Sequence, residues 1–291
     1  MKQLIRRHLL LFFRDKSNVF FSLLAVIIII MLYVTFLGNT VVDGLVSSLG
    51  ISKKLADATA CSLTLAGMIS MAAVTTCLGA LSVYVSDKSR AMKDFQTTPF
   101  PKAKITVSYI LSSSIAGIIL TFVSLFICLG FIIAKGGVVP DLQDWCLLIF
   151  TTILSVMCGN AMVYLLVIFV KSVNAFASLS TVLGTMIGFI MGIYMPIGIL
   201  PTGIQWVIKC FPMSHSASMY KQILSDPNVE KAFAAAPATD LENYRELYGI
   251  VFYYGEFKTN FWFSAFVLAV TTVLFYAVAI SVSRTSEKNL I

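Results

Sequence analysis

The side chains that usually carry enzymatic chemistry are few in this sequence and are not grouped. The only histidines are His8 and His215, and neither belongs to a recognisable set with a serine and an aspartate. The phosphate-binding pattern GxxxxGK[ST] and the zinc pattern HExxH do not occur. Six cysteines are present, none in a CxxC pair: Cys61, Cys77, Cys128, Cys146, Cys158 and Cys210. We interpret them as packing residues and leave open a Cys146–Cys210 disulfide. This inventory predicts a chain that performs no covalent chemistry and binds no metal or cofactor of its own.

The polar stretch SDKSRAMKDFQTTPFPKAKITVSY, which begins at residue 86, is the segment best suited to binding another protein. Its charges precede a turn signal, TPFP, at residues 98–101. One interpretation is a solvated loop. The other is a short helix over 86–100 that presses an apolar anchor into a soluble partner, while the charges set the register. The residues assigned to this role are Asp87, Lys88, Arg90, Lys93, Asp94, Phe95 and Pro99.

Composition places the elements around this segment in a membrane. Of 291 residues, 58% are hydrophobic and 12% are charged, whereas soluble domains average about 25% charged residues. The mean hydropathy is +0.89. Six apolar stretches reach the roughly 20 residues that a bilayer core requires. They are 19–37, 60–85, 105–133, 145–169, 174–197 and 261–282, and none contains Asp, Glu, Lys, Arg or His. We therefore predict an all-α, polytopic fold with six transmembrane helices, a single domain over 1–291, and transport without ion coupling.

The distribution of charge predicts how the chain is oriented. The net charge of +7 raises the question of nucleic-acid binding, but the basic residues lie in short segments between the apolar stretches. With six spans, one side carries 13 Lys and Arg residues, and the short segments of the other side carry three. Because basic residues concentrate on the cytoplasmic side, both termini are predicted to be cytoplasmic. No nucleic-acid partner is expected.

The stretch GFIMGIYMPIGILPTGIQWVIKCFPMSH, at 188–215, is apolar, but its prolines divide it into pieces too short to cross a bilayer. Between Pro201 and Pro212, a helix rising 1.5 Å per residue covers about half of a 30 Å core. A crossing would also place Lys209 near the bilayer centre, at a cost of a few kcal/mol. We predict a re-entrant hairpin that enters and leaves on the outer face. The expected segments are the hairpin at 198–212 and a helical extracytoplasmic cap at 213–260.

The N-terminal residues 1–17 carry apolar and basic side chains with helical periodicity. This pattern predicts a basic amphipathic helix on the inner surface of the bilayer, acting as a lipid anchor or as a docking surface for a cytoplasmic partner. The residues assigned to it are Arg6, Arg7, Phe12 and Arg14.

Small residues recur every four positions in the fifth apolar stretch. Gly184, Gly188 and Gly192 form a GxxxGxxxG ladder that permits close approach between helices. We expect this ladder to serve helix packing within the chain, to form a seam between two subunits, or to make this span a flexible gating helix beside the transport pathway.

Two motifs resemble the membrane subunit of ABC-2-type ATP-binding-cassette exporters. The segment after the second span is similar to the family pattern E-R-E-x-G-T-L-E-x-L-x-x-x-P, with Ala91 where glycine is usual. The second motif, YMPIGILPTGIQWVIKCFPMSH, is similar to G-x-x-x-P-x-x-x-L-P-x-x-x-Q-x-x-x-x-x-x-P. The positions that match the first pattern are Asp87, Lys88, Asp94 and Pro99, and those that match the second are Gly192, Pro196, Leu200, Pro201, Gln205 and Pro212.

The resemblance implies a permease of the bacterial plasma membrane that exports an amphipathic or hydrophobic compound. It implies a separate cytoplasmic ATPase, present in two copies, which holds ATP and magnesium. It also implies a second membrane subunit, with the pathway between the two subunits. We expect a homodimer of this chain and leave open a paralogue as the second subunit. Two alternatives remain open: export of a lipid-linked polysaccharide, and a membrane scaffold or sensor without transport activity.

Overall fold

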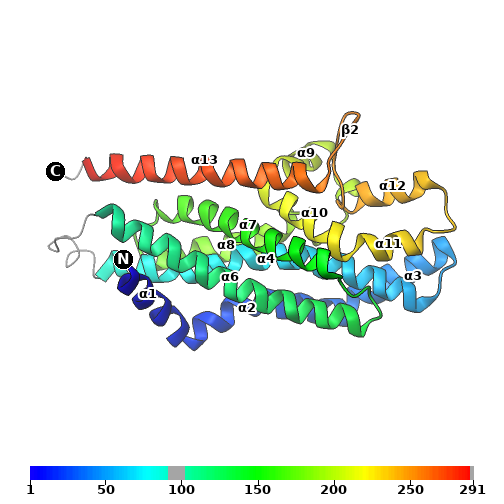
Figure 1. The fold of residues 1–291 in the computed structure, drawn as a ribbon, viewed down its shortest axis with the longest axis horizontal. Coiled ribbons are helices and arrows are strands. Elements are labelled where there is room, and N and C mark those ends of the chain that lie inside the picture. The colour runs from blue at the N-terminus through cyan, green and yellow to red at the C-terminus, as the bar shows by residue number, and fades with distance from the viewer. Residues whose placement is uncertain (91–101, 289–291) are drawn as a thin grey trace.

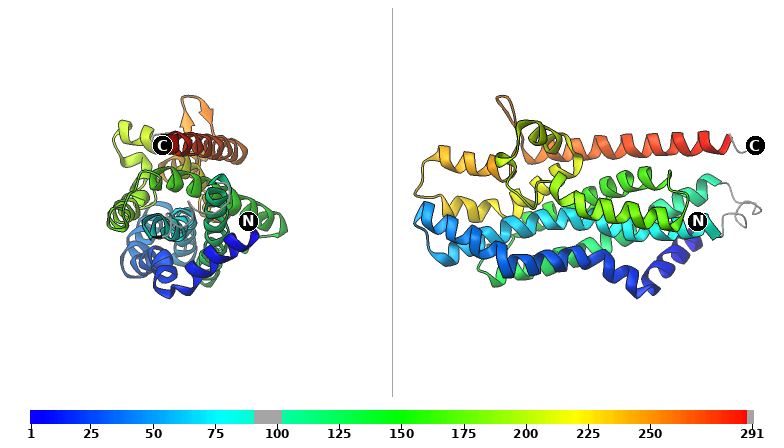
Figure 2. Two further views of the ribbon diagram at one scale, coloured as in Figure 1. Left: turned by 90° about the vertical axis from the view of Figure 1, so that its left-hand side faces the viewer. Right: turned by 180° about the vertical axis from the view of Figure 1, so that it is seen from behind.

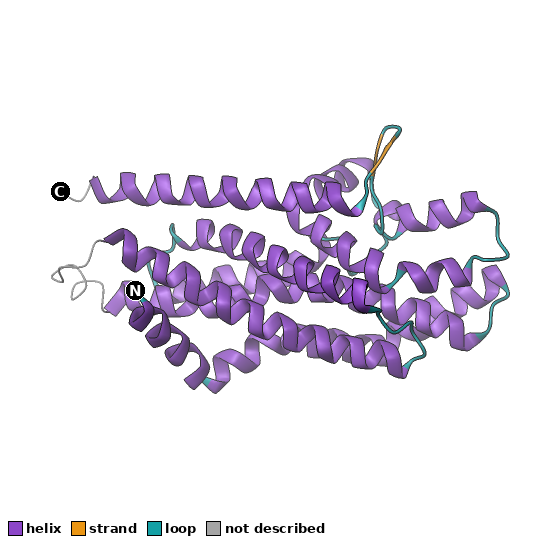
Figure 3. Ribbon diagram, viewed as in Figure 1, coloured by secondary structure: helices purple, strands orange, loops and turns teal. Residues whose placement is uncertain are grey.

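The protein is a long bundle of helices in which a two-stranded hairpin is the single β element of the described residues. The computed structural model describes residues 1–90 and 102–288. Figure 3 shows helices throughout, and the hairpin pairs β1 (Tyr253–Tyr254) with β2 (Phe257–Lys258). The all-α prediction is confirmed apart from this small element. Helices dominate because a bilayer offers no water to backbone groups, and a helix satisfies them within one segment.

Five helices of the described residues are long and apolar enough to cross a membrane. They are α4 (Lys53–Arg90), α6 (Lys102–Ala134), α7 (Leu142–Val167), α8 (Val173–Ile190) and α13 (Phe261–Lys288). They correspond to the second through sixth predicted spans. A sixth span results if Lys16–Leu24 and Val26–Thr35, which meet at a bend of 43°, are counted as one.

The N-terminal part is more broken than the sequence suggested. It consists of α1 (Lys2–Arg14), α2 (Lys16–Leu32), the π-helical turn Tyr33–Leu37 and α3 (Gly38–Leu49). The predicted first span stopped at residue 37, whereas the structure continues as helix to Leu49. Figure 2 shows α1 turning sharply away from α2 and lying against the bundle. The change of direction between α1 and α2 therefore separates α1, which lies along the side of the bundle, from the helix that follows it.

Helix α4 is the centre of the bundle. It packs against α2, α3, α6, α7, α8 and α10. In its most apolar stretch of 18 residues, 83% is buried inside the protein. Its buried face is rich in alanine, and such small residues let neighbouring backbones approach closely in membrane proteins. Helix α8 differs strongly from α4, because only 17% of its apolar 18-residue stretch is buried inside the protein.

The proline-rich region departs from the predicted boundaries. Helix α8 ends at Ile190 and not at residue 197, because the chain reverses at Gly192, whose φ of +64° suits glycine. A 3₁₀ turn (Ile197–Ile199), α9 (Thr202–Cys210) and α10 (Pro212–Leu224) follow. Helix α10 lies in the bundle against α4, α7 and α13, and every residue of it except Gln222 is buried. The second arm of this helix pair is therefore α10, which the sequence had assigned to the cap.

The cap is built from α11 (Asp226–Ala232), α12 (Ala238–Leu247) and the β hairpin. In Figure 1, α3, α11 and α12 lie at one end of the bundle, and the N-terminus and the end of α13 lie at the other. The N-terminal helix α1 and the C-terminal end of α13 therefore share one end of the molecule.

Candidate functional site

Three side chains from three helices meet at the end of α4, and we call them the Asp87 cluster: Arg7, Asp87 and Tyr109. Both terminal nitrogens of Arg7, on α1, donate hydrogen bonds to the carboxylate of Asp87, Nη1 to Oδ2 at 2.7 Å and Nη2 to Oδ1 at 3.3 Å. The Tyr109 hydroxyl of α6 donates to the same Oδ2 at 2.6 Å. A two-pronged arginine contact fixes orientation as well as distance. The cluster therefore holds α1 in one position on α4 and α6.

Two further residues of α1 dock it on the bundle. His8 is 2% exposed and stacks on the Tyr109 ring with a centroid distance of 3.9 Å. Phe12 is also 2% exposed and packs with Ala80, Ala116 and Leu120. On the side of α1 that was predicted to face the membrane, His8 and Phe12 thus contact other helices of the chain. The apolar residues left exposed on this helix are Leu10, Leu11 and Phe13.

The position of α1 also changes how its charged groups titrate. Burial, followed by the nearby positive charge of Arg7, lowers the pKa of His8 to about 4, so its imidazole is neutral at pH 7. The hydrogen bond to Asp87 raises the pKa of Arg7 above its already high ordinary value. The charged groups of this site are therefore the Arg7 guanidinium and the carboxylate that it contacts.

Lys88 ties the same end of α4 to another part of the bundle. Its Nζ donates to the carbonyl oxygens of Ile168 at 2.8 Å and Val170 at 3.0 Å. These carbonyls lie where α7 ends, and a cation there satisfies acceptors that the helix leaves open. Lys88 therefore fastens the connection between α7 and α8 to α4.

The predicted partner-binding residues are thus divided. Asp87 and Lys88 belong to α4 and contact residues of their own chain, whereas the sequence placed them at the start of a separate segment, 86–100. Arg90 is the last residue of α4. Four others lie outside the described residues: Lys93, Asp94, Phe95 and Pro99. Of the charged residues assigned to the interface helix, Arg6 and Arg14 are exposed and Arg7 joins the cluster.

The hairpin residues organise helix starts. Pro196 precedes the 3₁₀ turn, Pro201 precedes α9, and Pro212 is the first residue of α10, a position where its missing N–H costs nothing. Gln205 bonds back to the carbonyl of Leu200 at 2.8 Å. These residues shape the turn between α8 and α10.

The glycine ladder does not form one seam within the chain. At Gly184, a Cβ would meet open space, whereas at Gly188 it would overlap the ring of Tyr194. Gly192 lies beyond the helix, in the turn described above. A Cβ at Gly188 or at Gly192 would overlap a side chain of the segment that follows α8, Tyr194 or Ile197, whereas Gly184 faces open space.

The sequence did not predict that the polar side chains of α10 lie inside the bundle. The Ser216 hydroxyl lies 2.6 Å from the hydroxyls of both Ser70 on α4 and Ser155 on α7. Lys221 is 4% exposed and donates to the carbonyl of Tyr248 at 2.7 Å. The signal was present in SHSASMYKQ, which combines helix-compatible spacing with few apolar residues. A segment of that kind between apolar ones needs partners inside the bundle.

Ion pairs at the opposite end lie within the cap. We call the largest group the Arg245 cluster: Arg245 with Asp226, Glu230 and Glu242, at 2.8, 2.6 and 2.8 Å. Burial raises the pKa of Glu242, but hydrogen bonds from Lys258, Tyr253 and Arg245 outweigh it and lower the value to about 2. Lys209 of α9 is 8% exposed and pairs with Glu246 of α12 at 3.2 Å.

No metal-binding group of three His, Cys, Asp or Glu residues occurs in the part of the chain that the structure describes. Cys146 and Cys210 are both exposed free thiols, so the disulfide left open above is not present in this structure. The arrangement at the end of α4 suits the transmission of force between helices, since its contacts join separate elements.

Comparison with known proteins assigns this helical membrane architecture to a family. The model of the ABC-2 family transporter proteins matches residues 52–281. The chain belongs to the ABC-2 transporter family. It is a membrane permease of an ABC transporter, and in this family ATP hydrolysis lies on a separate subunit. The matched stretch of the permease runs from the start of α4 into α13, so α1, α2 and α3 precede it. No curated protein matches the chain.

Proposed function

We propose that this permease exports an amphipathic or hydrophobic compound, driven by ATP that a cytoplasmic ATPase hydrolyses. Two ATPase subunits, which hold ATP and magnesium, act on two copies of this chain. The protein resides in the plasma membrane of a bacterium with both termini in the cytoplasm. The segment 86–100, which includes the end of α4 and the residues after it, forms the contact with the ATPase.

The observation that supports this proposal most directly is the attachment of three parts of the chain to the end of α4: α1, α6 and the connection between α7 and α8. Asp87 joins α4 to α1 and α6, and Lys88 joins it to the connection between α7 and α8. All these contacts lie directly before residue 91. A force applied at this end of α4 would therefore reach several helices at once, which is what a mechanical coupling requires.

The cargo class follows from the chemistry of the spans. Between Asp57 and Asp87, α4 carries no charged residue, and the predicted spans contain none. A charged cargo crossing such helices would lose its hydration without gaining a charged partner. An apolar or amphipathic compound avoids this cost. This reasoning favours a lipid-like or drug-like cargo over an ion.

A charge-swap experiment tests the proposal. The permease is co-purified with its ATPase subunit in lipid nanodiscs, and cargo-dependent ATP hydrolysis is measured. Arg7→Asp removes the cluster contact and is expected to lower coupled hydrolysis about tenfold, the effect of losing ~1.4 kcal/mol. Arg7→Asp combined with Asp87→Arg restores the pair and much of the activity. Asp94→Lys, in the segment expected to contact the ATPase, is expected to weaken co-purification as well.

The matched control is Arg6→Asp, because Arg6 is the neighbouring residue and is exposed. It changes the charge of α1 by the same amount and leaves the Asp87 cluster intact. If Arg6→Asp and Arg7→Asp have equal effects, the cluster has no role in coupling. If Asp94→Lys and Phe95→Ala both leave the complex and its ATP hydrolysis unchanged, the ATPase contact is assigned to the wrong segment.

A further inference from the structure

Helix α4 contains two acidic residues, Asp57 near its start and Asp87 near its end. Positions 57 and 87 are separated by about 45 Å in a helix that rises 1.5 Å per residue. Asp87 belongs to the cluster described above. Asp57 has similar partners at the other end of the helix, where α4 also contacts α11 of the cap. We call this second group the Asp57 cluster: Tyr33, Asp57 and Lys135.

The carboxylate of Asp57 has one partner on each oxygen. The Tyr33 hydroxyl donates to Oδ1 at 2.8 Å, and Nζ of Lys135 donates to Oδ2 at 2.9 Å. Tyr33 is 1% exposed, and its ring packs edge-on against Phe131 of α6 with a centroid distance of 6.3 Å. Lys135 directly follows α6. Hydrogen bonds to a charged group are stronger than those between neutral groups. The cluster therefore joins the end of the first span, the start of α4 and the end of α6.

The same three parts of the chain meet in both clusters, with the types of partner exchanged. In the Asp87 cluster, the basic residue comes from the N-terminal helices and the tyrosine from α6. In the Asp57 cluster, the tyrosine comes from the N-terminal helices and the basic residue from the end of α6. A single fastening lets helices pivot about it, whereas a second one far away prevents the pivot. The N-terminal helices, α4 and α6 are therefore held as one body.

The local structure around Tyr33 serves this contact. Tyr33 begins the π-helical turn Tyr33–Leu37, and π turns are frequent at functional sites. Beyond the turn, Val42 and Leu45 of α3 are buried, and α3 packs against α4. Each residue rotates a helix by about 100°, so the extra residue of a π turn resets the face that follows. The turn thus lets Tyr33 face Asp57 while α3 keeps its apolar side on the bundle.

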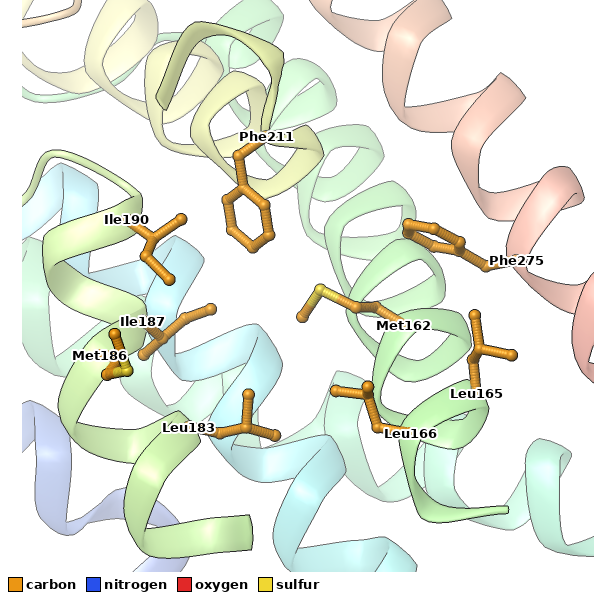
Figure 4. Close-up of a pocket in the computed structure, with 9 residues that line it drawn as sticks. All are labelled: Met162, Leu165, Leu166, Leu183, Met186, Ile187, Ile190, Phe211 and Phe275. Atoms are coloured by element: carbon orange, nitrogen blue, oxygen red, sulfur yellow. The ribbon is translucent and has the colours of Figure 1, made fainter. Parts of the chain in front are cut away.

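Helices α8 and α13 are held in another way. A pocket of about 330 Å³ lies between α7, α8 and α13, and Figure 4 shows its lining side chains, which are all Met, Leu, Ile or Phe. In the apolar 18-residue stretches of α8 and α13, only 17% and 22% are buried inside the protein. Apolar contacts have no preferred direction, unlike hydrogen bonds to a carboxylate. These helices can therefore shift against α4 and α6 without breaking either cluster.

We propose that Asp57 is a positioning residue of transport, which holds the N-terminal helices, α4 and α6 together at the end of the bundle that carries the cap. A force applied near Asp87 then reaches that end without being lost as rotation between the three parts. This role rests on the proposed ATP-driven transport, but the rigidity of the body can be measured without the ATPase.

The test measures one distance in the full-length permease in lipid nanodiscs. Spin labels are attached at Ser48→Cys on α3 and Val139→Cys after α6, two exposed positions, and the exposed Cys146 and Cys210 are replaced by serine. Electron paramagnetic resonance gives the distribution of distances between the labels. We expect one narrow distance in the permease alone, and the same distance in its complex with the ATPase, both without nucleotide and with ATP and vanadate.

Variants of the cluster separate positioning from simple stabilisation. Asp57→Leu removes both contacts and is expected to raise the population of a second, longer distance about tenfold, the effect of losing ~1.4 kcal/mol. ATP and vanadate should then change the distribution, while ATP hydrolysis continues. Asp57→Lys combined with Lys135→Asp restores the ion pair and the single distance. Tyr33→Phe, which removes only the hydroxyl, gives a smaller effect in the same direction and replaces Asp57→Leu if that variant does not fold.

The matched control is Asp43→Leu, because Asp43 of α3 is exposed and belongs to neither cluster. Equal distributions for Asp43→Leu and Asp57→Leu would overturn the proposal. A lower unfolding temperature of Asp57→Leu with an unchanged distance would overturn it too, because the pair would then only stabilise the fold. If no complex with an ATPase forms, the proposed function fails, and the distances in the permease alone still decide whether Asp57 holds the body together.

Discussion

The two ends of the bundle use ion pairs in different ways. In the Asp87 cluster, Arg7 and Asp87 are 80 positions apart, and Tyr109 lies 22 positions beyond Asp87. In the Arg245 cluster, all partners lie within 19 positions of the arginine. The first cluster fastens an N-terminal helix to two spans, and the second holds one cap together. Equally short ion pairs therefore either join segments that are far apart in the chain or stabilise one local unit.

The largest expected effect comes from the apolar contact that docks α1. Phe12→Ala removes a ring that is 2% exposed, and we expect a loss of about 3 kcal/mol in the stability of the docked helix. Hydrogen exchange of the α1 amides measures this loss. Phe13→Ala is the matched control, because the adjacent ring is 36% exposed. Equal exchange in the two variants would mean that α1 is not held by this face, and the contrast between the two ends would fail.

The second prediction concerns the cap. Arg245→Met leaves three carboxylates close together, and since Arg245 is 11% exposed we expect a local loss of about 2 kcal/mol. Hydrogen exchange should accelerate over residues 226–247, while the exchange of α1 stays unchanged. Lys231→Met, an exposed position on α11, is the control. Faster exchange in α1 would show that the Arg245 cluster also acts at a distance, contrary to its local role.

The smallest expected effect is a pH dependence at His8. Because its pKa falls from 6.5 to about 4 when α1 is docked, the undocked helix binds the proton more readily. Docking is therefore fully stable above pH 6.5, weakens as the pH falls toward 4, and changes no further below that. At pH 5.5, one unit below 6.5, the loss is about 1.4 kcal/mol. His8→Gln should remove this dependence in α1 hydrogen exchange. A variant with the same pH profile as the wild type would show that another group titrates.

Some features could be predicted from local pattern, and others could not. The positions of α4, α6, α7 and α13 follow from long apolar runs, because a bilayer sets both their length and their polarity. The end of α8 was placed seven residues too late, since the apolar character continues past the turn at Gly192. Hydropathy registers burial in lipid and in protein alike, so it does not register a reversal of the chain.

The candidate site shows the same limit. Asp87 and Lys88 were singled out because charges directly after a span are suited to an external partner. Their actual contacts are with Arg7 and with carbonyls near the end of α7, at separations of about 80 residues. A charge at the end of a helix has the same sequence signature whether it meets another protein or a distant part of its own chain. Tyr109 was missed for this reason, since nothing local distinguishes it.

The sequence by itself determined that this is a helical membrane protein of the ABC-2 family, without a nucleotide-binding loop of its own. The helical membrane fold follows from composition, because only a few architectures satisfy the backbone in a bilayer. The family follows from the resemblance of two motifs and from the family match over residues 52–281. The tertiary structure decided which helix is central, that the polar helix α10 lies inside the bundle, and that α1 is fastened to α4 and α6. The physical reason is that these outcomes depend on hydrogen bonds and packing between residues far apart in the chain, which no local periodicity encodes.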